Sequence, residues 1–509
     1  MAPTVSKRSF AAAALLLKLT AAYLADDGTV VIPGAASYNG LNLVPQMGWD
    51  NWNAFGCSVN ESLLLDTAQA MVDYGLRDLG YNYVILDDCW SIGRNASGYQ
   101  VPDPVTFPNG MKYIADHLHS MGLKFGMYSS AGLFTCGKRP GSLGYETQDA
   151  EFFAANGVDY LKYDNCFNQG QSGTPKLSFD RYNVMSQALN ATGRPIVYSL
   201  CNWGDDNPYD WAYTISNAGR MSGDIYDSFN RPDDRCPCTV NPCNWPGFHC
   251  SVLNILNKMA PIQSRTMSGY FNDMDMLEVG NGGQTDNEYV THFSMWAMMS
   301  SPLLMGTDVV GLSPANLAIY SNPAVIALNQ DPSAAAGSRI WRHECNDTDQ
   351  YGQCEQSLWM RGLKNGDTVI ALINGANSTQ TMNASLSDIF LDARTAGTSK
   401  PAAQLEEMWD VYDLWANRMS NEEAAAILAR NSTTAPAVIT ANSTSTTRYN
   451  TTAMSYADGL KANATALFGK KVGSVPAHGT WTASIPRHST GLYRLRMAGS
   501  GGMGKRDEL

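Results

Sequence analysis

The chain has 509 residues, of which 44% are hydrophobic and 16% are charged, and its formal net charge is −12. This length predicts at least two domains, and the composition is typical of a globular protein rather than a disordered one. An acidic surface repels phosphate backbones, which excludes nucleic acid as an expected partner. After the N-terminal segment no run of about 18 apolar residues occurs, so we expect no transmembrane helix and no membrane partner.

The N-terminal residues 1–25 are typical of a secretory signal peptide. Lys7 and Arg8 precede an apolar segment at residues 11–17, and alanines up to Ala25 supply the small residues of a cleavage site. A tail at residues 499–509 ends in Arg-Asp-Glu-Leu, which is close to the K-D-E-L retrieval signal. We therefore predict a secreted protein, with retention in the endoplasmic reticulum as the alternative.

Ten Asn-x-Ser/Thr sequons agree with passage through the secretory pathway. Seven of the ten lie from Asn346 onward, a higher density than chance would give. We predict N-glycosylation at these positions. The sequon asparagines are Asn60, Asn95, Asn190, Asn346, Asn377, Asn383, Asn431, Asn442, Asn450 and Asn463.

The cysteine pattern predicts disulfides, because the expected compartment is oxidising and the chain has 11 cysteines. A cluster over residues 236–250 resembles a metal knuckle, but we favour two nested disulfides there and expect no metal site. Cys201 is then the free thiol. Order and spacing predict the local pairs Cys57–Cys89, Cys136–Cys166 and Cys345–Cys354, and the cluster consists of Cys236, Cys238, Cys243 and Cys250.

Residues 26–331 alternate short apolar strands with amphipathic helices. Helical spacing is found at 61–74, 110–121, 147–156, 179–190 and 252–259. The alternation predicts a (β/α)₈ TIM barrel. We expect its strands at 44–52, 83–88, 124–130, 160–164, 196–201, 220–224, 270–276 and 303–306.

Residues 332–498 have a different pattern. Alternating strands at 358–363, 368–374 and 491–496 predict an antiparallel β-sandwich domain. Within it, residues 401–467 are rich in Thr, Ser and Asn and carry several sequons. We interpret this segment as a glycosylated insertion on the surface of the sandwich.

The segment VDYLKYDNC at residues 158–166 indicates where the chemistry lies. Side chains alternate along a strand, so Lys162, Asp164 and Cys166 are expected on one face. The carboxyl end of a barrel strand is the usual place for catalytic groups. A purely structural Lys–Asp pair is the alternative.

Other expected strands end in similar residues, and together they suit a neutral polyol. Carboxylates pair with sugar hydroxyls, and Trp faces stack on the apolar side of a pyranose. No cluster of histidines follows the strand ends, which argues against metal catalysis, and we expect no cofactor. The strand-end residues are Trp49, Asp50, Trp52, Asp87, Asp88, Tyr128, Cys201, Asn202, Trp203, Arg220, Asp224, Asp273 and Asp275.

Long motifs in the barrel region resemble one known family. MGWDNWNAFGC, YVILDDCW, YLKYDNC and NDMDMLEVGNGG are similar to the α-galactosidases (melibiases) of glycoside hydrolase family 27, fungal type. The resemblance covers residues 40–331 and continues more weakly through the sandwich. It implies a retaining exo-glycosidase that releases terminal α-D-galactose from melibiose, raffinose or galactomannan side chains.

The resemblance also implies the roles of the two catalytic acids. Asp164 would be the nucleophile, and Asp224 the general acid and then base, with Asp227 as an alternative acid. We expect Lys162 to keep Asp164 ionised, and Asp224 to need an apolar or anion-rich setting that holds its proton. Retention requires the two carboxyl groups to lie roughly 5–5.5 Å apart.

By the same resemblance, the other strand ends form the sugar pocket. Asp87 and Asp88 would bind the galactose 4- and 6-hydroxyls, although helix capping is an alternative role for them. Trp52 would form a wall of the pocket, and the remaining contacts would come from Tyr128 beside the nucleophile, Lys162 at the 3- and 4-hydroxyls, Arg220 at the 2-hydroxyl and Asp275 at the rim.

One position departs from the family pattern. Cys201-Asn202-Trp203 stands where many members have Cys-Glu-Trp, and the acid there reads the 2-position of the sugar. Asp205 and Asp206 are alternative readers of that position. Asn202 leaves α-N-acetylgalactosaminidase as an alternative, and β-L-arabinopyranosidase and a catalytically dead galactose-binding lectin are further ones. The sequence does not predict the oligomeric state.

Overall fold

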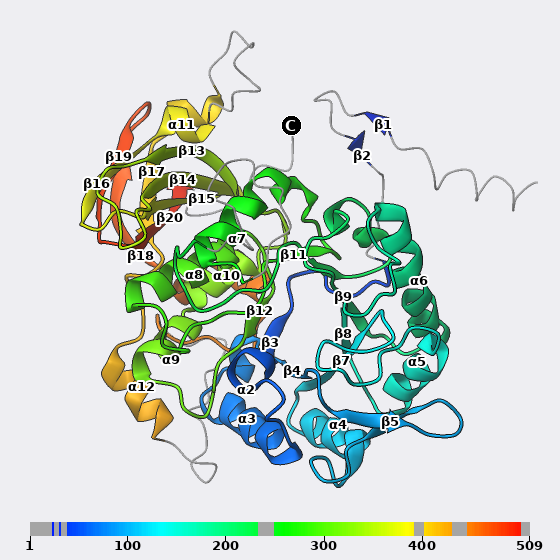
Figure 1. Cartoon of the computed structure of the whole chain (residues 1–509). Coiled ribbons are helices and arrows are strands. Elements are labelled where there is room, and N and C mark those ends of the chain that lie inside the picture. The colour runs from blue at the N-terminus through cyan, green and yellow to red at the C-terminus, as the bar shows by residue number, and fades with distance from the viewer. Residues whose placement is uncertain are drawn as a thin grey trace, which may run out of the picture.

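The computed structural model describes residues 38–232, 249–390, 402–429 and 445–499, together with the short strands β1 (Tyr23–Leu24) and β2 (Val30–Val31). Several predicted features lie outside the described residues: most of the signal peptide, Cys236, Cys238, Cys243, the sequons at Asn431 and Asn442, and the C-terminal Arg-Asp-Glu-Leu. In Figure 1 the first domain lies at the lower right and the second at the upper left.

The first domain is a closed barrel of eight parallel strands. They follow one another around the sheet in the order β11-β10-β9-β8-β7-β4-β3-β12. A parallel bridge between Leu277 and Met305 joins the two ends of this sheet, which confirms the TIM-barrel prediction. The strands are β3 (Met47–Asp50), β4 (Tyr83–Leu86), β7 (Lys124–Ser130), β8 (Tyr160–Asp164), β9 (Val197–Cys201), β10 (Ala218–Arg220), β11 (Phe271–Asp273) and β12 (Leu303–Met305).

Helices cover the outside of the barrel, and local signals fix where several of them begin. The side chain of Thr174 accepts a hydrogen bond from the backbone N–H of Leu177, and a proline follows it at the first helical position. Thr285 and Glu288 form a capping box. The helices are α2 (Trp52–Phe55), α3 (Glu61–Asp73), α4 (Gly110–Ser120), α5 (Glu146–Ala155), α6 (Pro175–Ala191), α7 (Val252–Met259), α8 (Asp286–Met298), α9 (Pro314–Tyr320) and α10 (Pro323–Asn329).

The second domain is the predicted antiparallel β-sandwich. A six-stranded sheet has the order β13-β14-β15-β20-β17-β18, and β16 pairs with β19 in a second sheet. Leu358, Ile370, Trp409 and Leu495 belong to one buried cluster with Met382 of β16. The strands are β13 (Ser338–Glu344), β14 (Glu355–Gly362), β15 (Thr368–Asn374), β16 (Gln380–Ser385), β17 (Trp409–Asp413), β18 (Lys470–Val475), β19 (Thr480–Ile485) and β20 (Ser489–Met497).

The prediction that residues 401–467 form a surface insertion is wrong for the described part. Strand β17 pairs with both β18 and β20 inside the main sheet. Farther along, the backbone N–H of Thr451 donates to the carbonyl of Asp78 at 2.7 Å, and Tyr456 donates to the carbonyl of Leu79 at 2.9 Å. The Thr/Ser/Asn-rich composition concealed the few apolar residues that dock this segment against the barrel.

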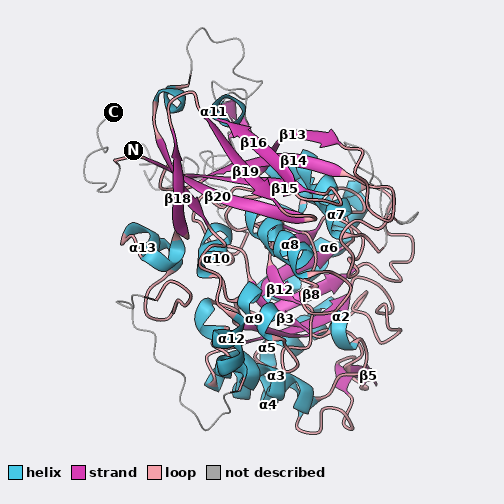
Figure 2. Cartoon of the chain, turned by 90° about the vertical axis from the view of Figure 1, so that its left-hand side faces the viewer, coloured by secondary structure: helices cyan, strands magenta, loops and turns pink. Residues whose placement is uncertain are grey.

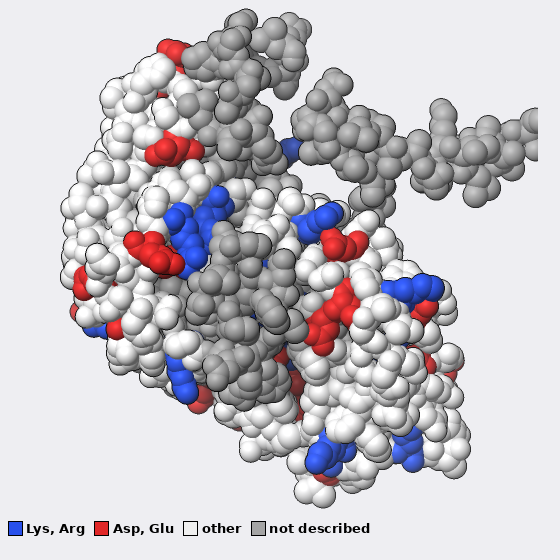
Figure 3. Space-filling model, turned by 45° about the horizontal axis from the view of Figure 1, so that its top comes forward, with Lys and Arg blue, Asp and Glu red and all other residues white. Residues whose placement is uncertain are grey.

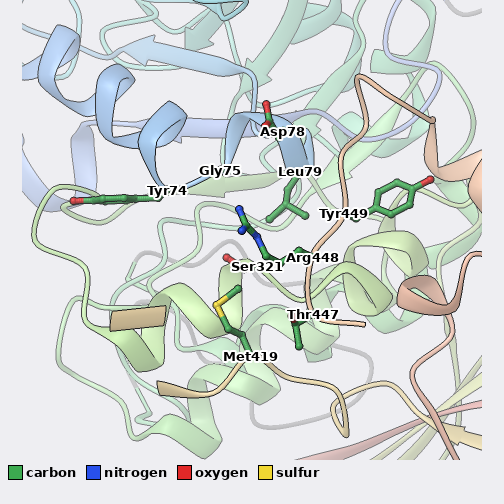
Figure 4. Close-up of a pocket in the computed structure, with 9 residues that line it drawn as sticks. All are labelled: Tyr74, Gly75, Asp78, Leu79, Ser321, Met419, Thr447, Arg448 and Tyr449. Carbon is green, nitrogen blue, oxygen red and sulfur yellow. The ribbon is translucent and has the colours of Figure 1, made fainter. Parts of the chain in front are cut away.

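Figure 4 shows the narrow pocket at this contact, which is lined by Thr447, Arg448 and Tyr449 together with Gly75 and Leu79 of the barrel.

The two domains share an interface built on helix α8. Figure 2 shows α8 between the strands of the sandwich and those of the barrel. Thr490 of β20 donates to Thr291 of α8 at 3.1 Å, and the indole of Trp415 donates to Ser294 at 2.8 Å. The sandwich is therefore in direct contact with a helix that follows barrel strand β11.

The surface agrees with several features of the sequence. On the face shown in Figure 3, basic side chains lie in small groups beside acidic ones rather than in one basic patch. Seven of the eight described sequon asparagines are exposed, and Asn450 is half-buried. Among the described residues, no helix has the length and apolar character needed to cross a bilayer.

Candidate active site

The carboxyl ends of the barrel strands bring the predicted site residues to one rim. Parallel register places Tyr128 beside Lys162, and Asp164 beside Cys201, on neighbouring strands. Because every strand of the barrel runs in the same direction, the side chains at these ends gather at one end of the barrel. All of the predicted residues except Trp52, Trp203 and Asp224 are buried.

Asp164, the expected nucleophile, is held rigidly at the end of β8. Its Oδ2 accepts a hydrogen bond from the hydroxyl of Tyr128 at 2.7 Å, and its Oδ1 accepts one from the backbone N–H of Asn165 at 2.8 Å. Only 6% of the residue is exposed. These hydrogen bonds hold the carboxylate in one orientation before a substrate binds.

Sulfur atoms also lie beside Asp164. Cys136 and Cys166 form a disulfide, and the Cys136 sulfur is 3.3 Å from Asp164 Oδ2. Cysteines joined to each other have no thiolate to offer a metal, so this cluster is no metal site. The bridge instead fastens the loop after β7 to the end of β8.

The three local disulfides present are the pairs expected from the sequence: Cys57–Cys89, Cys136–Cys166 and Cys345–Cys354. Cys250 is also disulfide-bonded. Cys201 is the free thiol among the described cysteines, and it is buried.

The electrostatics of Asp164 correct one expectation. Burial raises the pKa of Asp164 to about 7; the charge of Lys162 lowers this pKa, and the charge of Asp224 raises it. Lys162 therefore favours ionisation without outweighing burial. The reason is geometric, since the Lys162 ammonium makes its short contact with Asp87, at 2.6 Å, and lies 3.8 Å from Asp50.

Asp87 and Asp88 form a tight acidic turn after β4. Asp87 accepts the backbone N–H of Asp88 at 2.7 Å, and Asp88 accepts those of Cys89 and Gly137, each at 2.6 Å. A short strand, β5 (Ser91–Arg94), follows the turn, so these carboxylates cap no helix. Their fixed oxygens beside Lys162 are suited to bind adjacent hydroxyls of one sugar.

Asp224, the expected acid, lies in the loop after β10. Its Oδ1 pairs with Arg220 Nη2 at 2.9 Å, and the same nitrogen pairs with Asp275 Oδ2 at 2.7 Å. The side chain of Asp224 is 38% exposed. The closest charged neighbour of Asp224 is a guanidinium, while its own charge raises the pKa values of Asp164 and Asp275, so its setting contains charges of both signs.

Asp227, the alternative acid, is occupied elsewhere. Its Oδ1 accepts from Gln284 at 2.9 Å, and its Oδ2 accepts from the hydroxyl of Tyr289 at 2.8 Å and from the backbone N–H of Gly283. These bonds tie the loop after β10 to the loop after β11. The carboxylate of Asp227 is therefore engaged in holding these loops together, whereas the Asp224 side chain remains 38% exposed.

The residues after β9 also make defined hydrogen bonds. Asn202 is completely buried; its amide donates to the carbonyl of Asp205 at 2.7 Å, and its Oδ1 has no hydrogen-bond partner among the described residues. The carboxylate of Asp206 accepts a hydrogen bond from Ser178, near the start of α6, at 2.7 Å and is therefore bound to that helix. Asp206 is thus engaged outside the site, and Asn202 and Asp205 remain the candidate readers of the 2-position.

Cys201 and Trp203 flank Asn202 in different ways. The Cys201 sulfur accepts from Arg220 Nη1 at 3.6 Å, and burial raises the pKa of this thiol well above its usual range. Trp203 has a left-handed backbone with φ 58° and is half-buried.

Two supporting residues were missed by the sequence analysis. Asn165 accepts from Arg181 at 2.6 Å and donates to Asp205 at 3.3 Å, so it links the nucleophile strand to the loop after β9. Glu278 accepts from Asn53, the neighbour of Trp52, and burial raises its pKa to about 8. Both residues lie within the motifs quoted above, Asn165 in YLKYDNC and Glu278 in NDMDMLEVGNGG, but neither belonged to the predicted strand-end set.

A barrel rim that presents two acids, fixed hydroxyl-binding carboxylates and half-buried Trp side chains defines a glycoside hydrolase. Comparisons with known proteins identify the family. A family model described as alpha galactosidase A matches residues 44–331, and one for the alpha galactosidase C-terminal β-sandwich domain matches residues 353–437. The chain belongs to the α-galactosidase family.

Individual relatives agree over nearly the whole length. An alpha-galactosidase of Lachancea cidri is 53% identical over 472 residues, which are 92% of this chain and 97% of that protein. The structure of the Saccharomyces cerevisiae α-galactosidase is 52% identical with a TM-score of 0.85, covering 91% of this chain and 99% of that one. The structure of α-galactosidase I from Mortierella vinacea is 42% identical with a TM-score of 0.73, covering 90% and 98%.

Proposed function

We propose that this enzyme hydrolyses terminal non-reducing α-D-galactosyl residues of oligosaccharides such as melibiose and raffinose, and of galactomannan side chains. The observation that carries the proposal is the convergence of Asp164, Asp224 and the Asp87–Lys162 pair at one barrel rim. The S. cerevisiae α-galactosidase, 52% identical, has also been determined with raffinose.

The mechanism we propose is a double displacement with retention. Asp164 attacks the anomeric carbon while Asp224 protonates the leaving oxygen, and Asp224 then takes a proton from the water that releases galactose. Asp164 must be ionised for the attack, and the positive charge of Lys162 favours that state. Because Asp224 is the more exposed acid, a bound sugar would remove more water from it and thereby raise its affinity for a proton.

Substrate recognition follows from the fixed groups around these acids. Asp87, Asp88 and Lys162 would bind the hydroxyls at the 3-, 4- and 6-positions, and Arg220 with Asn202 would bind the 2-hydroxyl. The Oδ1 of Asn202, buried and unpaired among the described residues, would accept a bond from this hydroxyl once a sugar is bound. Trp52 and Trp203 would contact the faces of the sugar.

The test is hydrolysis of p-nitrophenyl α-galactoside, with the α-N-acetylgalactosaminide alongside and Asp164→Ala as control. We expect release from the galactoside that is lost in Asp164→Ala. Preference for the acetamido sugar would show the neighbouring specificity instead. No turnover of either substrate by folded protein would overturn the hydrolase and support the lectin alternative.

We further propose that the enzyme enters the secretory pathway and carries N-glycans. The exposed sequons and the disulfides support this proposal. Expression in a yeast host with and without residues 506–509 tests the tail, and endoglycosidase treatment tests the glycans. Equal secretion of both forms would contradict retention by the tail, and no change in mobility would contradict glycosylation.

A further inference from the structure

The loop that carries Asp224 is fastened at several points after the acid. We call residues 224–230 the acid loop. The backbone N–H of Ile225 donates to Asp275 Oδ2 at 2.8 Å, and that of Leu253 donates to the carbonyl of Phe229 at 3.0 Å. Asp227 anchors the middle of the loop through Tyr289. These contacts all come from the barrel.

One further contact comes from the sandwich domain. The ring of Phe229 stacks on the imidazole of His488, with centroids 4.9 Å apart and an interplanar angle of 22°. Both residues are buried, at 4% and 5% exposure. His488 lies in the turn between β19 and β20, so the second domain reaches directly to the acid loop.

His488 is itself held by the first turn of α8. Its Nδ1 lies 2.6 Å from Glu288 Oε1, while Glu288 Oε2 accepts from the backbone N–H of Thr285 at 2.7 Å. Burial acts to raise the pKa of Glu288, but these hydrogen bonds lower it below its usual value, so the carboxylate is available to His488. The hydroxyl of Thr291 also donates to the His488 carbonyl at 3.2 Å.

The first turn of α8 also contacts the acid loop directly. Tyr289, the residue after Glu288, donates to Asp227 at 2.8 Å. His488 and Tyr289 thus fix two points of one short loop, and both depend on the start of α8. A mobile loop would place Asp224 imprecisely, and a displacement of about 1 Å can cost about 10²-fold in rate.

We propose that His488 of the sandwich is a positioning residue for Asp224, acting through its stack on Phe229 and its bond to Glu288. This inference rests on the proposed function, in which Asp224 is the general acid. It makes the sandwich part of the catalytic apparatus rather than only a structural partner. His488 itself does not touch the reacting atoms.

The test uses two substrates that differ in their need for an acid. The 2,4-dinitrophenyl leaving group departs with little protonation, whereas the sugar leaving group of raffinose needs full protonation. We expect His488→Ala to lower kcat/KM on raffinose by about 10- to 100-fold. Its kcat/KM on 2,4-dinitrophenyl α-galactoside, which reports formation of the galactosyl-enzyme alone, should stay close to the wild-type value.

Two further variants and a matched control complete the test. His488→Asn keeps a side-chain donor toward Glu288 and tolerates the left-handed backbone, φ 50°, but it lacks the ring, so it should recover only the part of the raffinose activity that depends on Glu288. Phe229→Leu keeps an apolar side chain but removes the stack, and it serves if His488→Ala does not fold. His478→Ala is the control, since His478 has φ 56° and pairs with Glu406 at the surface, 54% exposed.

The outcomes separate this inference from the proposed function. An equal fall on both substrates, measured per folded molecule by circular dichroism and thermal melting, would overturn the positioning role. No fall in the raffinose activity of either His488→Ala or Phe229→Leu would overturn it as well. Asp224→Ala must show the substrate difference itself; if it does not, the proposed acid role fails.

Discussion

The two carboxylates proposed for catalysis occupy contrasting positions at the same barrel rim. Asp164 ends a barrel strand, is 6% exposed and receives hydrogen bonds from an adjacent strand and from the next residue. Asp224 lies in a loop, its side chain is 38% exposed, and it depends on Arg220 and on anchors in distant segments. The proposed nucleophile is thus positioned by the barrel alone, whereas the proposed acid lies in a loop that the sandwich domain also contacts, through His488.

The largest effect should come from removing each carboxylate in turn and adding azide. In Asp164→Ala, azide in the vacated space would displace the leaving group directly and give β-galactosyl azide. In Asp224→Ala, azide would attack the galactosyl-enzyme and give α-galactosyl azide. We expect Asp164→Ala to lose at least about 10³-fold in kcat on every substrate before azide is added.

Product analysis by NMR distinguishes the two azides, with 2,4-dinitrophenyl α-galactoside as substrate. Asp227→Ala is the matched control from the same loop and should give no galactosyl azide. Exchanged products would reverse the roles of the two acids, and rescue of Asp227→Ala would restore Asp227 as the acid.

A smaller effect should come from removing the positive charge of Lys162 near Asp164. Lys162→Met removes the positive charge that lowers the pKa of Asp164, so this pKa should rise above about 7. A larger share of Asp164 is then protonated at any given pH, and the acidic limb of kcat/KM should move to higher pH.

The measurement is the pH profile of kcat/KM on p-nitrophenyl α-galactoside. Lys112→Met is the control, because Lys112 pairs with Asp116 at 2.6 Å on the surface. An acidic limb that stays in place, or moves to lower pH, would contradict the role of Lys162 in favouring ionised Asp164.

The smallest effect should come from Tyr128→Phe, which removes one hydrogen bond to Asp164. That bond lowers the pKa of Asp164 and is worth about 0.5–1.5 kcal/mol, so kcat should fall by up to about tenfold. Steady-state kinetics on both substrates would show equal losses, because the nucleophile rather than the acid is affected. A loss confined to raffinose would contradict this assignment.

Much of the barrel was predictable because its strands are continuous apolar runs. Strands β7 and β8 begin and end where the sequence predicted. Strand β10 begins two residues before its predicted start, because Ala218 and Gly219 give a weak strand signal. The segment at 401–467 was misread since its sequons and polar residues outnumber the apolar side chains that join the domain cores.

The sequence by itself determined the fold class, the local disulfides and the set of strand-end residues, since these depend on patterns within short segments. Only the tertiary structure decided how those residues pair. Lys162 bonds to Asp87 rather than to the nucleophile, Asp227 is an anchor, and His488 reaches the acid loop from another domain. Such contacts join residues far apart in the chain, where no local pattern of propensity or periodicity records their distance.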